Sequence, residues 1–524
     1  MERLSHYILP EHTNELYRNE AISSISLAKD VAEKINEIID ALNERVDTSL
    51  AKEHEQDGRI NKAILYMKDN LINSLRDLLA SYNSEVVKGY VMEAYGAELA
   101  NMKVFVTPQM YGAAGNGSKN DIYAIENAIA ALEPGGVLYF PKGTYLMQGH
   151  EVVINKENIT FAGEGLILCD YGFRPKASNF RAVGLRMEGL AYSQECRAFW
   201  INNPATTGAP IEYIENFSFK DCHFKNFFYS VAAVGGAYNH DGTEEMVGYP
   251  VRDVVIENCY STTYTDQNAG HFQCIQVENI AYINNRTYGG KNASSYNAIK
   301  ANGYIRVIGN YDHNNSYASC EIENGSGRAV IANNTFNYKI WVDDSFSAVV
   351  NANTAEGGIY VTVGTNVGDA ENIVISNNVC KNIRCEQFGT YNGGVIRNVN
   401  IVNNVVNGDN THGIWIHGNA VQTARICGNF ITGTNTNDIA IQRNDQLDCY
   451  TQGNFGNGQL MLIAGSGGQV YALDVYNMTV SGNRDSLPAS HLEREYNGLK
   501  VVNTAGNAYR LVVDENGDFY TVAY

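Results

Sequence analysis

Between residues 255 and 430 one short motif recurs: VIENC (255–259), YINNR (282–286), VIGNY (307–311), VIANN (330–334), VISNN (374–378), IVNNV (401–405) and RICGNF (425–430). In each copy a short apolar run ends at an asparagine. These asparagines are Asn258, Asn285, Asn310, Asn334, Asn353, Asn378, Asn404, Asn429, Asn454 and Asn483, in steps of 27, 25, 24, 19, 25, 26, 25, 25 and 29 residues. A steady period of this length is typical of a solenoid, in which each turn contacts only its neighbours.

The recurring asparagine has a physical explanation in a stacked structure. Asn side chains at equivalent places in successive turns can hydrogen-bond to one another, and Asn also tolerates the left-handed backbone of tight turns. We therefore predict a mainly β chain that winds into a parallel β-helix. The composition agrees, because the chain has 49 Gly, only 9 Pro and 18% charged residues.

The segment before the repeats is VTPQMYGAAGNGSKNDIYAIENAIAALEPGGVLYFPKGTYLMQGHEVVINKENITFAGEG (106–165). Asn120 or Asp121 can cap a short helix near 121–133, with Ile122, Ile125 and Ile129 on its apolar face. The strands of the first turns follow it. We expect this helix to cover the open end of the solenoid, where strand edges would otherwise be exposed.

This segment resembles the start of the pectate-lyase-like right-handed parallel β-helices found in phage tail spike proteins. It departs from the family pattern at Asn116, where Gly-Asp-Gly is usual, and at Gln109, where an acidic residue is usual. The resemblance covers residues 104 to about 484 and implies a β-helix domain at 101–484. It also implies a virion tail appendage that binds, and often cleaves, a bacterial surface polysaccharide.

Residues 1–100 are predicted to form a helical stem. The stretch 20–80 has no Pro and one Gly, and its apolar residues step by three and four. One seam contains Ile25, Ala28, Ala32, Ile35, Ile39, Leu42 and Val46, and the other contains Ile60, Ile64, Met67, Leu71, Leu75 and Leu78. A lone helix cannot bury such a stripe, so we expect a coiled coil in a homotrimer, with a helical hairpin within one chain as the alternative. The resemblance implies that this stem attaches to phage tail or baseplate proteins.

Residues 485–524 leave the repeat. The segments 509–513 and 519–522 flank the turn DENGD, which predicts a hairpin in a small C-terminal β module.

Charge and cysteine usage exclude several kinds of partner. The net charge is -19 and the pI is about 5.0, so we expect no nucleic-acid partner and no membrane partner. The charged N-terminus and the lack of a long apolar run predict a chain without a signal peptide, made in the host cytoplasm. None of the ten cysteines forms a C-x-x-C pair, so we expect buried thiols, no metal site and no cofactor.

Equivalent side chains of a parallel β-helix stack in columns with a spacing of about 4.8 Å. The middle strand of each turn has the inward pairs Ile275/Val277, Cys320/Ile322, Ile340/Val342, Ile359/Val361, Ile383/Cys385, Ile414/Ile416 and Ile439/Ile441. One predicted outward column contains Gln276, Lys300, Glu321, Trp341, Tyr360, Arg384, Trp415 and Ala440. Its neighbour contains Glu278, Asn302, Glu323, Asp343, Thr362, Glu386, His417 and Gln442.

Aromatic residues and carboxylates that meet on one face are what a sugar-binding groove needs. The predicted substrate-binding residues are Trp341, Tyr360, Trp415, Arg384, Lys300 and His417. The predicted catalytic residues are Glu321, Glu323, Asp343 and Glu278.

Glycoside hydrolysis uses two carboxyl groups, about 5–5.5 Å apart for retention and about 6.5–9.5 Å apart for inversion. Glu323 and Asp343 on adjacent turns suit the first spacing, and pairing Glu323 with Glu278 or with Glu321 suits the second. We therefore favour a glycosidase. A polysaccharide lyase on the same face, a non-catalytic receptor-binding spike and a bacterial β-helix enzyme outside a virion are the alternatives.

Overall fold

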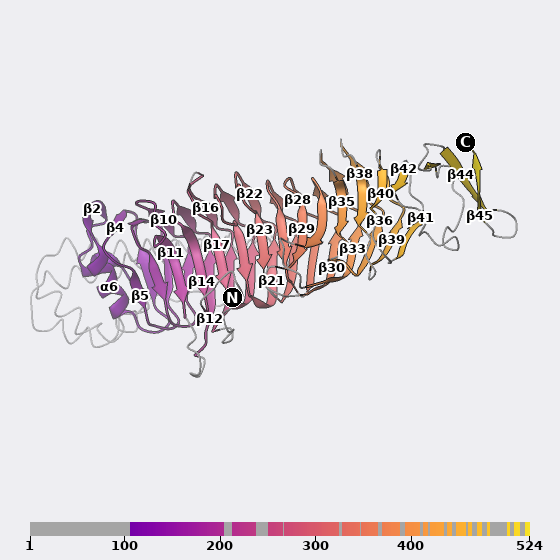
Figure 1. Cartoon of the computed structure of the whole chain (residues 1–524). Coiled ribbons are helices and arrows are strands. Elements are labelled where there is room, and N and C mark those ends of the chain that lie inside the picture. The colour runs from indigo at the N-terminus through magenta and orange to yellow at the C-terminus, as the bar shows by residue number, and fades with distance from the viewer. Residues whose placement is uncertain are drawn as a thin grey trace, which may run out of the picture. The chain divides into compact units, whose positions relative to one another are not determined.

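The computed structural model describes residues 105–203, 212–236, 250–265, 267–323, 327–345, 347–364, 369–387, 394–408, 412–417, 420–433, 437–442 and 447–456, together with the strands between 459 and 523 (Figure 1). All of them belong to one of the chain's two units, Val104–Tyr524. The predicted stem at 1–100 lies outside the described residues, so the coiled coil and the trimer remain predictions. Within the part described, no helix is long and apolar enough to cross a membrane.

The described chain is mainly β, and its strands form three parallel sheets consistent with a right-handed β-helix (Figure 1). Most turns contribute one strand to each sheet in the same order. The first sheet consists of β1 (Phe105–Val106), β3 (Val137–Phe140), β6 (Thr160–Gly163), β9 (Arg181–Val183), β12 (Ile214–Lys220), β15 (Val251–Glu257), β18 (Val277–Ile283), β21 (Asn302–Ile308), β24 (Arg328–Ala332), β27 (Ser347–Asn351), β30 (Ala370–Ser376), β33 (Ile396–Val402), β36 (Thr423–Cys427), β39 (Asp448–Gln452) and β41 (Gln469–Leu473).

The second sheet has shorter strands. It consists of β2 (Asn116–Asn120), β4 (Thr144–Met147), β7 (Leu166–Cys169), β10 (Arg186–Gly189), β13 (His223–Lys225), β16 (Tyr260–Thr262), β19 (Arg286–Tyr288), β22 (Tyr311–His313), β25 (Thr335–Phe336), β28 (Thr354–Ala355), β31 (Val379–Cys380), β34 (Val405–Asn407) and β37 (Phe430–Thr432).

The third sheet is the one that the sequence predicts to hold the functional face. Its parallel strands are β5 (Val152–Ile154), β8 (Phe173–Pro175), β11 (Arg197–Asn202), β14 (Tyr229–Val234), β17 (Phe272–Ile275), β20 (Tyr296–Ile299), β23 (Cys320–Glu323), β26 (Ile340–Asp343), β29 (Ile359–Val363), β32 (Ile383–Gln387), β35 (His412–His417), β38 (Asn437–Gln442), β40 (Gln459–Ile463) and β42 (Thr479–Gly482). Beyond β42, the strand β43 (Lys500–Val502) and the antiparallel hairpin β44 (Ala508–Val513) and β45 (Phe519–Ala523) continue the sheet.

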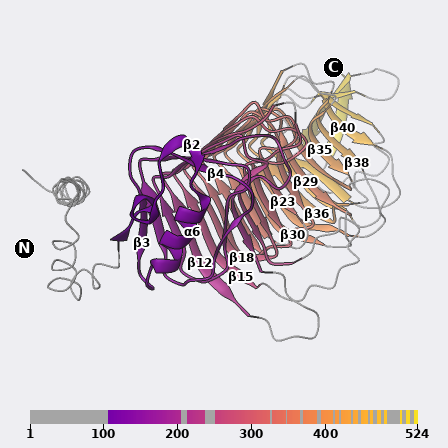
Figure 2. The same cartoon turned by 90° about the vertical axis from the view of Figure 1, so that its left-hand side faces the viewer.

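A short helix lies at the start of the stack. The helix α6 (Ile122–Ala131) contacts the 3-10 helix η1 (Pro108–Tyr111), β1 and β5. Figure 2 shows α6 at the end of the stack nearest the viewer. Asp121 occupies the position before the helix, but its carboxylate accepts hydrogen bonds from the backbone of Ala114 and Gly115 instead of capping the helix. The acidic residue therefore holds the preceding loop against the helix start.

A ladder of buried asparagines links the turns where the first sheet leads into the second. It consists of Asn285, Asn310, Asn334, Asn353, Asn378, Asn404, Asn429 and Asn454. In Asn310, for example, the side-chain amide donates to the carbonyl of Tyr282 at 2.8 Å and to Oδ1 of Asn334 at 3.0 Å. The backbone N–H of Asn310 also donates to Asn334 Oδ1, at 2.8 Å. The predicted rung-to-rung bonding is confirmed for these members.

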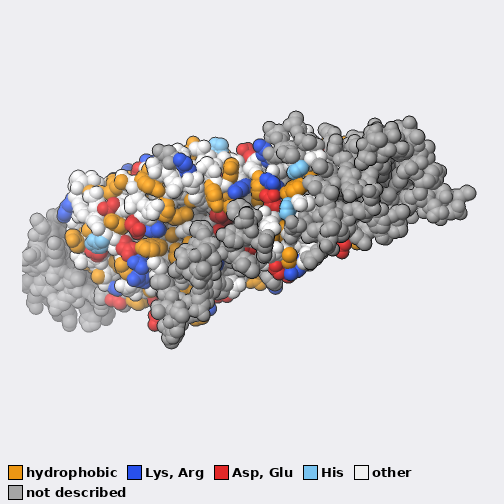
Figure 3. Space-filling model, in the orientation of Figure 1, with side chains coloured by type: hydrophobic (Ala, Val, Ile, Leu, Met, Phe, Trp, Pro, Cys, Tyr) orange, Lys and Arg blue, Asp and Glu red, His pale blue; other side chains and the backbone are white. Residues whose placement is uncertain are grey.

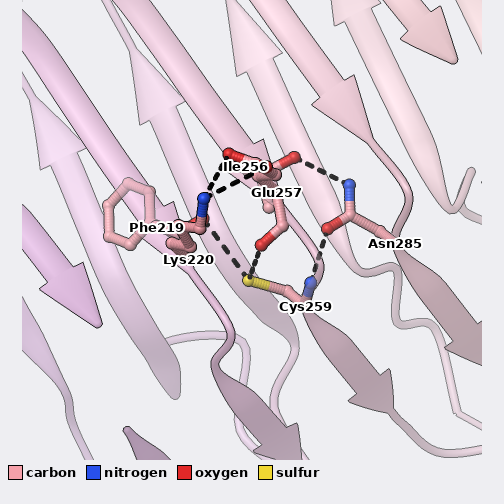
Figure 4. A network of polar contacts seen from close by, with 6 residues as sticks. All are labelled: Phe219, Lys220, Ile256, Glu257, Cys259 and Asn285. Atoms are coloured by element: carbon pink, nitrogen blue, oxygen red, sulfur yellow. Dashed lines mark hydrogen bonds and ion pairs between the residues drawn. The ribbon is translucent and has the colours of Figure 1, made fainter. Parts of the chain in front are cut away.

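The ladder begins one residue away from where the sequence predicts. Asn258 is exposed, and Cys259 takes the stacked position, where its N–H donates to Asn285 Oδ1 at 2.8 Å (Figure 4). The thiol of Cys259 lies 3.5 Å from the carbonyl of Phe219 and 3.4 Å from that of Glu257. The left-handed residue is also the one before each ladder position, such as Asn377 with a φ of 55° before Asn378. At each corner, one residue adopts the left-handed backbone conformation of the turn and the next residue stacks in the ladder.

The interior changes along the stack. Phe140, Phe161, Phe173, Phe180 and Phe199 fill the first turns with ring centroids 5.0–6.3 Å apart. In later turns Ile, Val, Ala and Cys predominate at the inward positions, as the sequence predicts, but Phe272, Tyr282, Tyr296 and Phe336 are also buried there. Cys427 is partly exposed, whereas the other cysteines are buried free thiols.

One inward position of the second sheet is a carboxylic acid. Asp312 is almost fully buried, and Oδ1 accepts hydrogen bonds from the hydroxyls of Thr287 at 2.7 Å and Ser295 at 2.6 Å. Burial raises the pKa of Asp312 to about 6. Its ionisation in the folded protein is therefore unfavourable.

The asparagine ladder should make a large contribution to stability. Replacing Asn378 with Ala removes the acceptor for Asn353 and the donor to the Val350 carbonyl, and leaves these buried groups unpaired. We expect the free energy of unfolding to fall by about 3 kcal/mol, measured by denaturant titration. Asn377→Gly, which keeps the left-handed backbone beside the ladder, is the matched control; equal losses in the two variants would contradict the ladder's role.

The raised pKa of Asp312 predicts a pH-dependent stability difference. The folded state favours the neutral acid. The free energy of unfolding of the wild type therefore decreases as pH rises from 3.8, the ordinary pKa of Asp, to about 6, the pKa of Asp312 in the folded protein. Asp312→Asn, which carries no charge, should therefore be more stable than wild type at pH 8 by up to about 3 kcal/mol. The difference should vanish near pH 4, and denaturant titrations of both proteins at the two pH values test this. A difference that does not change with pH would contradict the burial argument.

Candidate functional site

The outward face of the third sheet carries two adjacent columns of side chains. Backbone pairing aligns the residues of what we call the tryptophan column: Arg174, Trp200, Ala232, Gln273, Asn297, Glu321, Trp341, Tyr360, Arg384 and Trp415. It likewise aligns the acidic column: Ile275, Ile299, Glu323, Asp343, Thr362 and Glu386. The predicted alignment from Glu321 to Trp415 and from Glu323 to Glu386 is therefore correct.

Four predicted members lie elsewhere: Glu278 and Asn302 belong to strands of the first sheet, and Gln276 and Lys300 are corner residues. Glu278 is in β18 of the first sheet, where its carboxylate forms a 2.8 Å ion pair with Arg252. Lys300 follows β20 with a φ of 48°, at the corner between two sheets. The true column members on these turns are Gln273 and Asn297.

The error has a simple structural cause. The pattern Ile275-Gln276-Val277 looks like one strand in sequence, but Gln276 has a φ of 54° and turns the chain between β17 and β18. The two apolar residues therefore belong to different sheets. Alternation holds only within a strand, so a pattern that spans a corner assigns residues to the wrong face.

Glu321 lies at the centre of a polar cluster. Its Oε2 accepts hydrogen bonds from Ser294 Oγ at 2.5 Å and Asn297 Nδ2 at 2.8 Å, and Oε1 lies 3.5 Å from the Tyr317 hydroxyl. The side chain is only 6% exposed. Burial raises the pKa of Glu321, although the two hydrogen bonds and Lys339 oppose the shift. Glu321 is thus a carboxyl group whose protonated form is favoured more than in water.

Asp343 has a different environment from Glu321. The hydroxyl of Thr362 donates to Asp343 Oδ1, and Trp341 Nε1 donates to the same hydroxyl at 2.7 Å. This chain directs a hydrogen-bond donor at Asp343, which favours an acceptor oxygen there. Asp343 also contributes to the raised pKa of Glu321, because its negative charge opposes ionisation of that residue.

The sequence predicts an exposed Trp341, but the structure buries this side chain. It is 7% exposed, Lys339 Nζ lies 3.9 Å from its ring centroid, and the Tyr317 ring lies 5.9 Å away. Its indole therefore holds Thr362 and Lys339 in place. Glu323 is buried to a similar degree at 6% exposure, on the adjacent turn to Asp343.

The turns that follow present a partly exposed set of aromatic and charged groups. Arg384 Cζ lies 5.8 Å from the Tyr360 ring centroid, and Arg384 forms a 3.0 Å ion pair with Glu386. Burial raises the pKa of Glu386 and Arg384 opposes that shift. Trp415 stacks on His412, with 4.7 Å between ring centroids and 11° between planes.

The two histidines here favour their neutral forms. Burial lowers the pKa of His412, with a further contribution from Arg384, and burial also lowers the pKa of His417. His417 lies 6.0 Å from Trp415 and pairs in register with Gln442. These residues offer imidazole nitrogens and ring faces next to a guanidinium.

Sequence reasoning missed several side chains of this face, both around the acidic cluster of Glu321, Glu323 and Asp343 and beside Trp415. Lys339 has the same parity as Trp341, so alternation extended by two residues would have found it. Ser294 and Tyr317 come from the segments before β20 and β23, whose lengths vary from turn to turn, and no periodic signal marks them. His412 precedes Trp415 by three residues and falls outside simple alternation.

The described residues show how charged groups are distributed around the site. No group of His, Cys, Asp and Glu among the described residues is arranged to hold a metal ion. On the face in Figure 3, acidic and basic side chains are interspersed with hydrophobic ones. The described part of the third sheet offers carboxyl groups, aromatic rings and a few cations for chemistry.

Comparison with known proteins finds a family match over part of the chain and similarity to phage appendage proteins. Residues 105–337 match the family described as rhamnogalacturonase A/epimerase, pectate lyase-like. The preneck appendage protein of Bacillus phage PZA is 23% identical over 436 residues, covering 69% of this chain and 48% of that protein. The pre-neck appendage protein of Bacillus phage phi29 is 22% identical over 436 residues, and the match again covers 69% of this chain and 48% of that protein. The chain spans about half the length of the curated relatives it matches.

Among solved structures, tailspike protein 3 of bacteriophage CBA120 matches with a TM-score of 0.40 and 15% identity, covering 80% of this chain and 69% of that one. The family match and the phage relatives confirm the resemblance seen in the segment 106–165.

Proposed function

We propose that this chain, with its pectate-lyase-like domain and phage pre-neck appendage relatives, is a virion appendage that binds and hydrolyses a bacterial surface polysaccharide. The observation that carries the proposal is the set of carboxyl groups around Glu321 on the outward face of the third sheet. Aromatic and basic residues follow it along the same columns. Such a face suits a polymer of sugars, which needs ring stacking and hydrogen bonds over several residues.

Glu321 and Asp343 have the environments expected of an acid and its partner. Burial favours protonated Glu321, which can donate its proton to a glycosidic oxygen. Asp343 receives a hydrogen bond from Thr362, which suits a carboxylate that acts on water or on the sugar. Glycosidases use two carboxyl groups with these complementary roles.

The register allows two alternative pairs of catalytic carboxyl groups: Asp343 with Glu323, or Asp343 with Glu321. Glu323 and Asp343 are register partners on adjacent turns, so their strands are about 4.8 Å apart, near the spacing for retention. Glu321 and Asp343 are diagonal neighbours, with Cα atoms roughly 8 Å apart by strand spacing and rise, within the range for inversion. The stereochemistry of the product therefore identifies the pair.

A second candidate function is a receptor-binding spike without catalysis. It is favoured by the low exposure of Glu321 and Trp341, 6% and 7%. In that case the exposed part of the face, around Tyr360, Arg384 and Trp415, binds glycan and no bond is cleaved.

We also propose that the protein is a homotrimer that attaches to the phage through residues 1–100. The heptad seams in that segment support this, and so does an exposed apolar column on the second sheet. In its later turns Val379, Val405 and Phe430 are successive register partners and are 46%, 37% and 45% exposed. Large exposed apolar residues in a row are typical of a surface that another chain covers.

Hydrolysis at Glu321 is tested with polysaccharides from candidate bacterial hosts. Glu321→Gln should lower the rate at which reducing ends appear by at least about 100-fold while binding is kept, because Gln cannot supply the proton. In the wild type the rate should fall as pH rises past the raised pKa of Glu321.

Glu278→Gln is the matched control, because this carboxylate lies in the first sheet and pairs with Arg252. Unchanged turnover of Glu321→Gln would remove Glu321 from the acid role. Ultraviolet absorbance of an unsaturated uronate in the products would indicate a lyase, and binding without any product would favour the receptor-binding spike.

The trimer is tested by sedimentation of the full chain. We expect a mass three times the 57.7 kDa of one chain, because the heptad seams need partners to be buried. A mass of one chain would contradict the coiled-coil stem.

A further inference from the structure

The tryptophan column does not begin at the acidic cluster. Backbone pairing continues it from Glu321 back through Asn297, Gln273 and Ala232 to Trp200. The chain has only three tryptophans, Trp200, Trp341 and Trp415, and all three lie in this one column. The column therefore brings together residues that are far apart in the sequence.

Trp200 lies between two guanidinium groups. Arg174 is on the preceding turn and Arg197 is on the same strand, and each Cζ is 4.7 Å from the Trp200 ring centroid. Both arginine side chains are mostly buried, with exposed fractions of 19% and 16%. Trp200 itself is partly exposed.

These guanidinium groups have compensated charge and spare donors. Arg174 forms a 2.5 Å ion pair with Glu151, and Arg197 forms a longer one of 3.5 Å with Glu195. Arg174 Nε and Arg197 Nη1 are buried and form no hydrogen bond with the described residues, and Arg197 Nη1 is the atom that lies 3.5 Å from Glu195 Oε2. A guanidinium has five N–H donors and each ion pair uses only some of them, so the exposed part of each side chain can still donate to a ligand oxygen.

The distance between Trp200 and Glu321 limits the kind of ligand that could contact both residues. Trp200 and Glu321 are four turns apart in register, which corresponds to about 19 Å at the strand spacing. The intervening members Ala232, Gln273 and Asn297 are uncharged and contain no aromatic ring. One extended polymer can reach both places, whereas a single sugar residue cannot.

We propose that Trp200, Arg174 and Arg197 form a remote subsite for a sugar residue of the polysaccharide that is cleaved at Glu321. The guanidinium groups donate to hydroxyl oxygens of the sugar, because Glu151 and Glu195 already balance their charge. The subsite makes binding depend on chain length and directs cleavage to the interior of the polymer. This inference rests on the proposed function, because it concerns the same substrate.

The test measures binding by a Glu321→Gln protein, so that the polymer is not consumed. The probes are the purified surface polysaccharide of the host strain that the wild type binds, and fragments of it graded by length. Adding Trp200→Ala should weaken binding of long chains about five- to tenfold and leave short fragments unaffected. The loss should be the same at low and high salt, since hydroxyl recognition involves little net charge.

Two further variants serve as controls for the Trp200→Ala experiment. Tyr213→Ala is the matched control, because Tyr213 forms a comparable contact with Arg252, 3.6 Å from Cζ to ring centroid, but lies outside the third sheet. Trp200→Phe keeps an apolar ring in place if Trp200→Ala does not fold, and it should show a smaller loss of the same kind.

The outcomes separate this inference from the proposed function. Equal binding of long chains by the Trp200 variants and their parent, while Glu321 remains necessary for cleavage, would overturn the subsite and leave the hydrolase. A length-dependent loss in a protein whose wild type cleaves nothing would keep the subsite and overturn hydrolysis. A loss confined to low salt would contradict recognition through hydroxyl groups, and failure of the wild type to bind any polysaccharide would overturn both.

Discussion

The buried asparagine amides are the interaction on which the regular stacking of the later turns depends. From Asn285 to Asn429, each ladder side chain donates from Nδ2 to a main-chain carbonyl and to the next asparagine, and accepts at Oδ1 from a neighbouring turn. Because these amides are buried, their donors and acceptors must find hydrogen-bond partners within the protein. This requirement sets the position of each turn relative to the next at one corner of the solenoid.

Regular turns at that corner make the columns of the third sheet possible. Glu321, Trp341 and Tyr360 come from three successive turns and face the same side because their strands pair in register. Their close stacking buries Glu321 and Trp341, which raises the pKa of the carboxyl and directs the indole N–H to Thr362. The unusual properties of the site thus follow from rung-to-rung packing on an outward face.

The sequence predicted this site where strands are regular and failed where the chain turns. The alignment from Glu321 to Trp415 is correct, because apolar-x-apolar patterns there lie inside single strands. Glu278 and Lys300 were assigned wrongly, because Gln276 and Lys300 are left-handed corner residues. Trp200 was missed because 32 residues separate it from Ala232, and 41 separate Ala232 from Gln273, so the period is hidden by the long connections.

By itself, the sequence determined the class of fold, the approximate period, the ladder asparagines from Asn285 to Asn454 and the resemblance to phage β-helix proteins; the predicted ladder position Asn483 lies outside the described residues. These depend on local alternation and on residues that recur at one place in every turn, which a linear pattern records. Only the tertiary structure decided that the acids and Trp341 are buried, that Cys259 begins the ladder and that all three tryptophans share a column. Burial and register result from contacts between turns, and because the connecting segments vary in length, sequence spacing does not encode those contacts.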